Sequence, residues 1–126
     1  MKYLLDTNAL LYLLAAPDKL SARAAQVVRW ETDIAVSIAS LWEIAIKKSI
    51  GKLQIALKIS DVERECENRQ IQILSIDTRS LDGLVVLPRI HSDPFDRIII
   101  SQAITHAMTV VTSDTVIPRY PVTVIW

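Results

Sequence analysis

The stretch His91-Ser92-Asp93-Pro94-Phe95-Asp96-Arg97, continued by Ile98-Ile99-Ile100-Ser101-Gln102-Ala103, predicts a helix start with more carboxylates than a helix start needs. Asp93 is a good N-cap, because its oxygen can accept hydrogen bonds from the free N–H groups of the first turn. Pro94 falls at the first helical position, where its missing N–H costs nothing. Asp96 either completes a capping box and compensates the helix dipole, or points into a metal site. Other carboxylates that reach the same place would favour the metal site.

Short apolar runs alternate with helical patterns on both sides of this stretch. Strands are expected at residues 2–5, 34–37, 71–75, 109–112 and 122–125, with the third at or near a sheet edge because it alternates most. Helices are expected at residues 9–16, 22–31, 39–50, 78–86 and 93–107, and a capping box at Ser60–Glu63 predicts one more, up to about Arg69. Strands separated by helices indicate an α/β fold with a mostly parallel sheet and helices on both faces.

Composition limits the class of protein. The 126 residues are expected to form one domain, 1–126, and 51% hydrophobic content excludes a disordered chain. A formal net charge of zero removes strong general attraction to polyanions, so any recognition of nucleic acid must be local. The lone Cys66 cannot form an internal disulfide, no signal-peptide pattern precedes Asp6, and no uncharged apolar run is long enough for a membrane span. We expect a cytoplasmic protein that does not enter a membrane.

Three carboxylates are expected at the carboxyl end of the sheet, where α/β proteins place their chemistry. Asp6 directly follows the first strand, Asp114 follows the fourth, and Asp96 lies in the first turn of the helix that leads into the fourth. Each has a simpler interpretation: Asp6 can cap the first helix, and Asp114 can be a turn residue. Their arrival at one end of the sheet favours a shared site.

Glu43 is the fourth candidate. The helix over residues 39–50 has a predicted apolar stripe, and Glu43 lies at its border, about 100° around the helix from Trp42. The stripe consists of Ile38, Leu41, Trp42, Ala45, Ile46 and Ile50. An exposed Glu43–Lys47 pair is the simpler interpretation. However, Glu43 is also within two turns of the carboxyl end of the preceding strand.

These segments together resemble a PIN domain, and most of all the VapC-type toxin ribonucleases of bacterial toxin–antitoxin pairs. The resemblance rests on residues 4–8, 40–47, 91–103 and 112–114 and covers essentially the whole chain. It implies the strand order 3-2-1-4-5, an Mg²⁺ or Mn²⁺ site, endoribonuclease activity on RNA and silencing by a cognate antitoxin. The family's acidic residues match Asp6, Glu43, Asp96 and Asp114, with Asp93 as a cap or outer ligand. Asn8 and Thr112 match polar positions that orient the acids.

The residue types suit metal-assisted hydrolysis. Mg²⁺ prefers oxygen ligands, and a metal-bound water can attack a phosphodiester while the ion neutralises growing charge. Cys66 has no plausible base nearby, so a covalent route is not indicated. Arg97, Lys47, Lys48 and Lys52 can hold phosphates or be ordinary surface charges, and His91 can touch substrate or simply be solvated.

The predicted first helix, residues 9–16, is apolar all round, although a helix on one sheet face needs only one apolar stripe. The second helix, through Val27, Val28 and Trp30, or another subunit, or a partner must cover the excess. We therefore expect a homodimer or an antitoxin complex that buries Leu10, Leu11, Leu14 or their neighbours.

The alternative function is a non-catalytic Mg²⁺-binding α/β signalling or interaction module. A phosphoacceptor domain normally has paired acids after the first strand and a lysine after the last. This chain has only Asp6 at the first position and no lysine after Lys58. A silent module would be favoured if one of the acids were missing, and none is.

Overall fold

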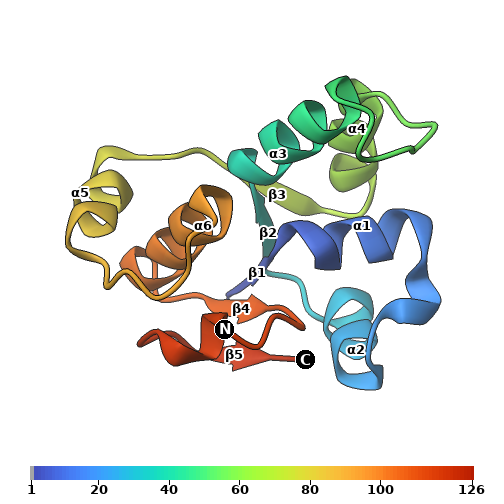
Figure 1. Ribbon diagram of the computed structural model, residues 1–126. Coiled ribbons are helices and arrows are strands. Elements are labelled where there is room, and N and C mark those ends of the chain that lie inside the picture. Colours follow the sequence, from blue (N-terminus) through green and yellow to red (C-terminus); the bar gives the residue numbers. More distant parts are fainter. Residues whose placement is uncertain (1) are drawn as a thin grey trace.

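Five parallel strands form one sheet in the order β3-β2-β1-β4-β5 in the computed structural model, which describes residues 2–126 (Figure 1). This confirms the α/β class and the strand order that the resemblance implies. The elements are β1 (Tyr3–Leu5), α1 (Thr7–Ala15), η1 (Pro17–Lys19), α2 (Ala22–Trp30), β2 (Ile34–Ser37), α3 (Ile38–Ser49), α4 (Ile59–Asn68), β3 (Ile71–Leu74), α5 (Thr78–Val86), α6 (Pro94–Thr105), β4 (Thr109–Val111), η2 (Ile117–Arg119) and β5 (Val124–Ile125). None of the helices within residues 2–126 combines the length and apolar character needed to cross a membrane.

Helices cover both faces of the sheet. Neighbouring residues of β1 point to opposite faces: Leu5 packs in the core formed with α1, α2, α3 and α4, whereas Leu4 packs in the core formed with α6 and η2. Figure 1 shows α1, α2 and α4 on one side of the strands and α5 and α6 on the other. Burial on both faces explains why the strands read as continuous apolar runs.

The helix starts follow from local capping, with one correction. Ser21 caps α2 by accepting from the N–H of Ala24 at 3.0 Å, as an N-cap serine should. The predicted capping box that opens with Ser60 is wrong, because α4 begins at Ile59 and Lys58 is its N-cap residue. Asp61 instead accepts the N–H of Lys58 at 2.9 Å, so the acidic half of the box is shifted by two residues.

The first helix is covered mainly from within the chain. Leu10 is fully buried, and Leu11 and Leu14 pack partly buried against the same core. Leu10 is therefore wrong as a candidate interface residue. Trp30 is 74% exposed and does not cover α1 as suggested, whereas Val28 does contribute to that core. Three large apolar side chains are instead left exposed on α5, namely Leu81, Val85 and Val86.

The topology brings several elements to one edge of the sheet. Because all strands are parallel and each connecting helix returns antiparallel to them, the carboxyl ends of β1, β2 and β4 lie where α1, α3 and α6 begin. This is the edge at which the candidate carboxylates are expected.

Candidate functional site

Asp6 is buried at the carboxyl end of β1, where it is also the N-cap of α1. Its side chain is held by two donors: the N–H of Ala9 at 2.8 Å and the hydroxyl of Thr112, the residue that follows β4. Burial raises the pKa of Asp6 to about 6, and the charges of Asp114 and Glu43 raise it further against the lowering effect of these hydrogen bonds. The capping interpretation is thus correct, and the same carboxyl group also faces other acids.

Thr112 connects Asp6 to Asp114. Its hydroxyl oxygen accepts the N–H of Asp114 at 2.9 Å while its proton goes to Asp6. Thr112 thus joins the two acids by one hydrogen bond to each. Burial acts to raise the pKa of Asp114, but hydrogen bonds from the N–H of Val116 and from His91 outweigh it and lower that pKa. Asp114 is therefore a carboxylate at neutral pH.

Glu43 is buried, with 4% of its surface exposed, so the exposed-pair interpretation is wrong. The Lys47 ammonium does lie 2.8 Å from its carboxylate, and the hydroxyl of Thr7 donates to it at 2.6 Å. The predicted apolar stripe of α3 is also wrong in part, since Trp42 and Ile50 are about 60% exposed. The helix turns Glu43 inward, toward the start of α1, and leaves Trp42 outside.

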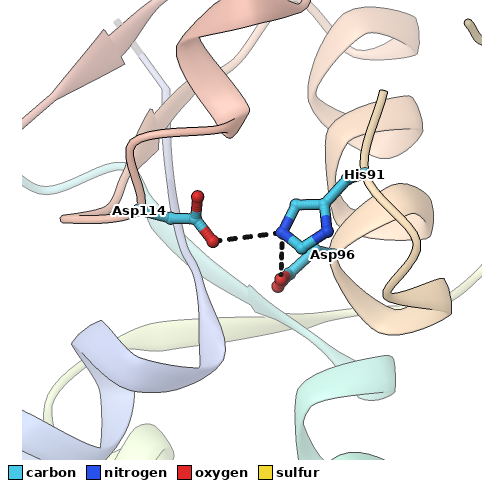
Figure 2. A group of neighbouring side chains, drawn as sticks. All are labelled: His91, Asp96 and Asp114. Carbon is cyan, nitrogen blue, oxygen red and sulfur yellow. Dashed lines mark hydrogen bonds and ion pairs between the residues drawn. The ribbon is translucent and has the colours of Figure 1, made fainter. Parts of the chain in front are cut away.

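The His91 ring lies between the carboxylates of Asp96 and Asp114 (Figure 2). The Nε2 atom of His91 lies 3.1 Å from a carboxylate oxygen of Asp96 and 3.1 Å from one of Asp114. The Nδ1 atom accepts the N–H of Asp93 at 3.3 Å, which leaves the proton on Nε2, between the two acids. The three side chains point toward one another from the loop after β4, the loop before α6 and the first turn of α6.

Asp93 and Asp96 have separate tasks. Asp93 is the N-cap of α6 and accepts the N–H groups of Phe95 at 2.8 Å and Asp96 at 3.2 Å. Burial raises the pKa of Asp96 to about 7; the charges of Asp93, Asp6 and Glu43 add to this, whereas His91 lowers it. The predicted acids thus lie within one another's electrostatic field at one end of the sheet.

His91 is held in place by Tyr120, a residue that the sequence did not single out. The buried Tyr120 hydroxyl accepts the N–H groups of Ile90 at 3.0 Å and His91 at 2.6 Å. Arg97 donates to the same oxygen at 3.2 Å and to the carbonyl of Pro88 at 2.7 Å. Arg97 therefore supports the His91 loop, since its guanidinium binds Tyr120 and the carbonyl oxygens of Leu87 and Pro88. No sequence pattern marks Tyr120, because it acts from 29 residues away.

Two other residues considered in the sequence lie outside the cluster. Asn8 is exposed, and within residues 2–126 its side chain has no hydrogen bond to a carboxylate. Cys66 is buried in α4, where burial raises its thiol pKa to about 11, so it is a poor nucleophile.

A hollow of about 550 Å³ lies beside His91. Arg89 and Arg97 in its lining place positive charge at the edge of the site. Its lining residues are Leu84, Val85, Arg89, His91, Ser92, Pro94 and Arg97. A cationic hollow next to a carboxylate cluster suits a ligand that carries phosphate groups.

The donor set fits a divalent cation. One ligand atom each from His91, Asp96 and Asp114 lies within 4.8 Å of the others. Asp6 and Asp96 both have pKa values raised by burial and by neighbouring acids, which is repulsion that a bound cation would relieve. Hard, oxygen-rich donors of this kind suit Mg²⁺ or Mn²⁺.

Comparison with known proteins agrees with the fold. The family model described as PIN domain matches residues 3–122. Ribonuclease VapC22 of Mycobacterium tuberculosis is 30% identical over 113 residues, which cover 88% of this chain and 85% of that protein.

Solved structures share the fold over almost their whole length. VapBC2 from Rickettsia felis, bound to a DNA fragment from its promoter, has a TM-score of 0.71 at 21% identity and covers 99% of this chain and 98% of its own. A toxin–antitoxin complex from Klebsiella pneumoniae has a TM-score of 0.67 at 20% identity and covers 99% and 97%. From the family match and the VapC22 relationship, the chain belongs to the PIN domain family.

Proposed function

We propose that the chain, over residues 1–126, is a divalent-metal-dependent endoribonuclease that acts as the toxin of a toxin–antitoxin pair. The observation that carries the proposal is the meeting of Asp6, Glu43, Asp96 and Asp114 at one end of the sheet, in a PIN domain chain related to a ribonuclease. Two of these acids, Asp6 and Asp96, have pKa values raised by burial and by neighbouring acids, a pattern that is typical of functional sites and unfavourable for stability.

Asp6, Asp96 and Asp114 would hold Mg²⁺ or Mn²⁺, with Glu43 beside them and Asp93 as an outer ligand. When bound, such an ion polarises the phosphodiester and lowers the pKa of a water molecule. The chain's own residues keep these ligands in place. Thr112 orients Asp6 and the backbone of Asp114, and Thr7 and Lys47 fix Glu43.

Hydrolysis needs a group that accepts the proton of the attacking water and a hydrogen-bond donor for the phosphate oxygens. Water would form a bond to phosphorus while the bond to a ribose oxygen breaks, and that oxygen would take a proton from solvent to become a hydroxyl. A carboxylate of the cluster would accept the proton of the attacking water. The Nε2–H of His91, which faces the same space, is placed to donate a hydrogen bond to a phosphate oxygen.

We also propose an antitoxin partner, a homodimer and a cytoplasmic location. Solved proteins with this fold include toxin–antitoxin complexes, which supports the first of these. The apolar side chains left exposed on α5 give the chain a surface suited to association. Sedimentation of the chain alone, and with its co-expressed antitoxin, measures both forms of association.

Cleavage of a panel of RNAs by the wild type and by Asp6→Asn tests the activity. We expect cleavage by the wild type with Mg²⁺ or Mn²⁺, none with EDTA, and a loss of at least about 100-fold for Asp6→Asn, because the variant lacks a ligand carboxylate. Thr123→Ala, at an exposed position away from the acids, is the matched control and should cut like the wild type. Metal binding without cleavage of any RNA would favour the non-catalytic interaction module instead.

A further inference from the structure

Trp42 is a large aromatic side chain left 60% exposed beside the acidic cluster. It precedes the buried Glu43 in α3, and its ring contacts Phe95, which precedes Asp96 in α6. The ring centroids are 5.1 Å apart and the rings are nearly perpendicular, at 81°. The aromatic pair thus spans the joint between the two helices that supply Glu43 and Asp96.

This contact holds the Trp42 ring in place without covering it. An edge-to-face pair fixes the orientation of a ring, so less side-chain freedom is lost when a further group stacks on it. The structure therefore provides a preformed flat surface at Trp42, the residue before Glu43, supported by Phe95, the residue before Asp96.

The occupant that fits this surface is a nucleobase of the substrate. The chain has zero net charge and an acidic pocket, so general electrostatic attraction contributes little to RNA affinity. Stacking of unpaired bases on aromatic rings supplies affinity without needing net charge. The Lys47 ammonium, one turn after Glu43, is paired with the Glu43 carboxylate at 2.8 Å, so the Trp42 ring and not this cation is the group that α3 offers to RNA.

We propose that Trp42 is a stacking platform for an unpaired RNA base next to the scissile phosphate. Phe95 is the positioning residue that supports the ring. This proposal rests on the proposed ribonuclease function, because it concerns the substrate of the same site.

Binding in EDTA tests stacking separately from cleavage. Replacing Trp30 and Trp126 by Phe leaves Trp42 as the sole tryptophan, so its fluorescence reports on its own surroundings. The probes are ten-residue oligo(rU) and oligo(rA), a duplex of the two, and an abasic oligoribonucleotide of the same length and charge. We expect single strands with bases to quench Trp42 and to bind more tightly than the duplex or the abasic strand.

Variants at position 42 measure how much stacking contributes to RNA affinity. Trp42→Ala should weaken binding of the single strands by roughly 5- to 150-fold, the range for losing one stacked base, while Trp42→Phe should stay within a few-fold of the wild type. Trp30→Ala is the matched control, since that ring is also exposed but lies at the end of α2, and it should change nothing. With Mn²⁺ and a cleavable strand, Trp42→Ala should raise KM more than it lowers kcat.

The proposal is overturned if the abasic strand quenches Trp42 and binds as tightly as the strands with bases. It is also overturned if Trp42→Ala dissociates a dimer or an antitoxin complex but leaves RNA affinity unchanged, because the ring would then serve a protein interface. Failure of the ribonuclease function looks different: no RNA is cut with Mn²⁺ whichever residue stands at position 42.

Discussion

Asp93 and Asp96 are three residues apart on one helix turn, and a substitution at each should reveal its different task. Asp93 receives two N–H groups of the first turn of α6, whereas Asp96 faces His91 and has a pKa raised to about 7. A cap stabilises the fold whether or not metal is present. A buried carboxylate among other acids opposes folding when it is charged.

Asp96→Asn should abolish cleavage and leave the metal-free protein at pH 8 as stable as the wild type or more so. The amide keeps an acceptor for the His91 N–H but removes the charge that the other acids repel. Asp93→Ala should lose about 1 kcal/mol of unfolding free energy, the typical cost of a missing N-cap, partly offset by lower repulsion on Asp96. Thermal melts with EDTA and with Mn²⁺ measure both changes.

Asp93→Ser is the control for this comparison, because serine keeps the cap without the charge. It should recover most of the stability that Asp93→Ala loses. If Asp96→Asn were clearly destabilised without metal while Asp93→Ala was not, the two roles assigned here would have to be exchanged.

At the scale of single residues, the sequence could predict which carboxylates gather at one end of the sheet but not what surrounds them. The positions of Asp6, Asp96 and Asp114 after strands and in a helix start could be read from local patterns. The place of His91 could not, because Tyr120 holds its loop from a distant part of the chain. A loop histidine carries no local signal of such a partner.

At the scale of elements, the strands and helix ends were largely predictable. Buried parallel strands form dense apolar runs, and caps such as Ser21 are short-range signals. The face of α3 was not predictable, because periodicity gives the spacing of a stripe and not the neighbours that accept it. Thr7 and Ser40 give Glu43 a polar lining inside the fold, with their hydroxyl oxygens 3.0 Å apart, so a carboxylate is buried while Trp42 is exposed.

The packing of α5 against α6 gives a prediction for a helix pair. A methyl group on Gly83 would lie 2.8 Å from the hydroxyl oxygen of Ser101, which is itself held at 2.5 Å by the carbonyl of Ser80. Gly83→Ala would gain up to about 1 kcal/mol of helix propensity. We expect the steric cost, about 1–3 kcal/mol for overpacking, to exceed that gain, so that unfolding by urea shows a less stable protein.

Ser101→Ala removes the oxygen that the new methyl group would meet. In the double variant Gly83→Ala/Ser101→Ala, the destabilisation should therefore be smaller than the sum of the single changes. Additive effects would mean that the helices separate enough to admit the methyl group, and that Gly83 does not set their distance.

At the scale of the whole molecule, the acid cluster links stability to pH. The pKa values of Asp6 and Asp96 in the folded chain, about 6 and about 7, lie above their ordinary value of 3.8. Between pH 7 and pH 4 the folded chain therefore binds protons that the unfolded chain does not, and the unfolding free energy should rise as pH falls through this range. Asp114 acts oppositely, because its lowered pKa gives a contribution that is lost below about pH 4.

A bound divalent metal ion should weaken the dependence of the unfolding free energy on pH, because it stabilises the folded chain most at alkaline pH. Without metal, we expect the melting temperature to increase from pH 8 to about pH 5 and to fall again at lower pH, where acid denaturation begins. A divalent ion that binds only the folded chain adds about 2.7 kcal/mol at a hundredfold excess over its dissociation constant, and it does so where the carboxylates are charged. Melts from pH 4 to pH 8 with EDTA and with Mn²⁺ should therefore differ most at pH 8 and converge toward pH 5.

Asp96→Asn should show a weaker pH dependence in EDTA, because the group with the highest pKa of the cluster is gone. Equal metal stabilisation at pH 5 and pH 8 would contradict the assignment, since it would mean that the ion binds without competing with these protons.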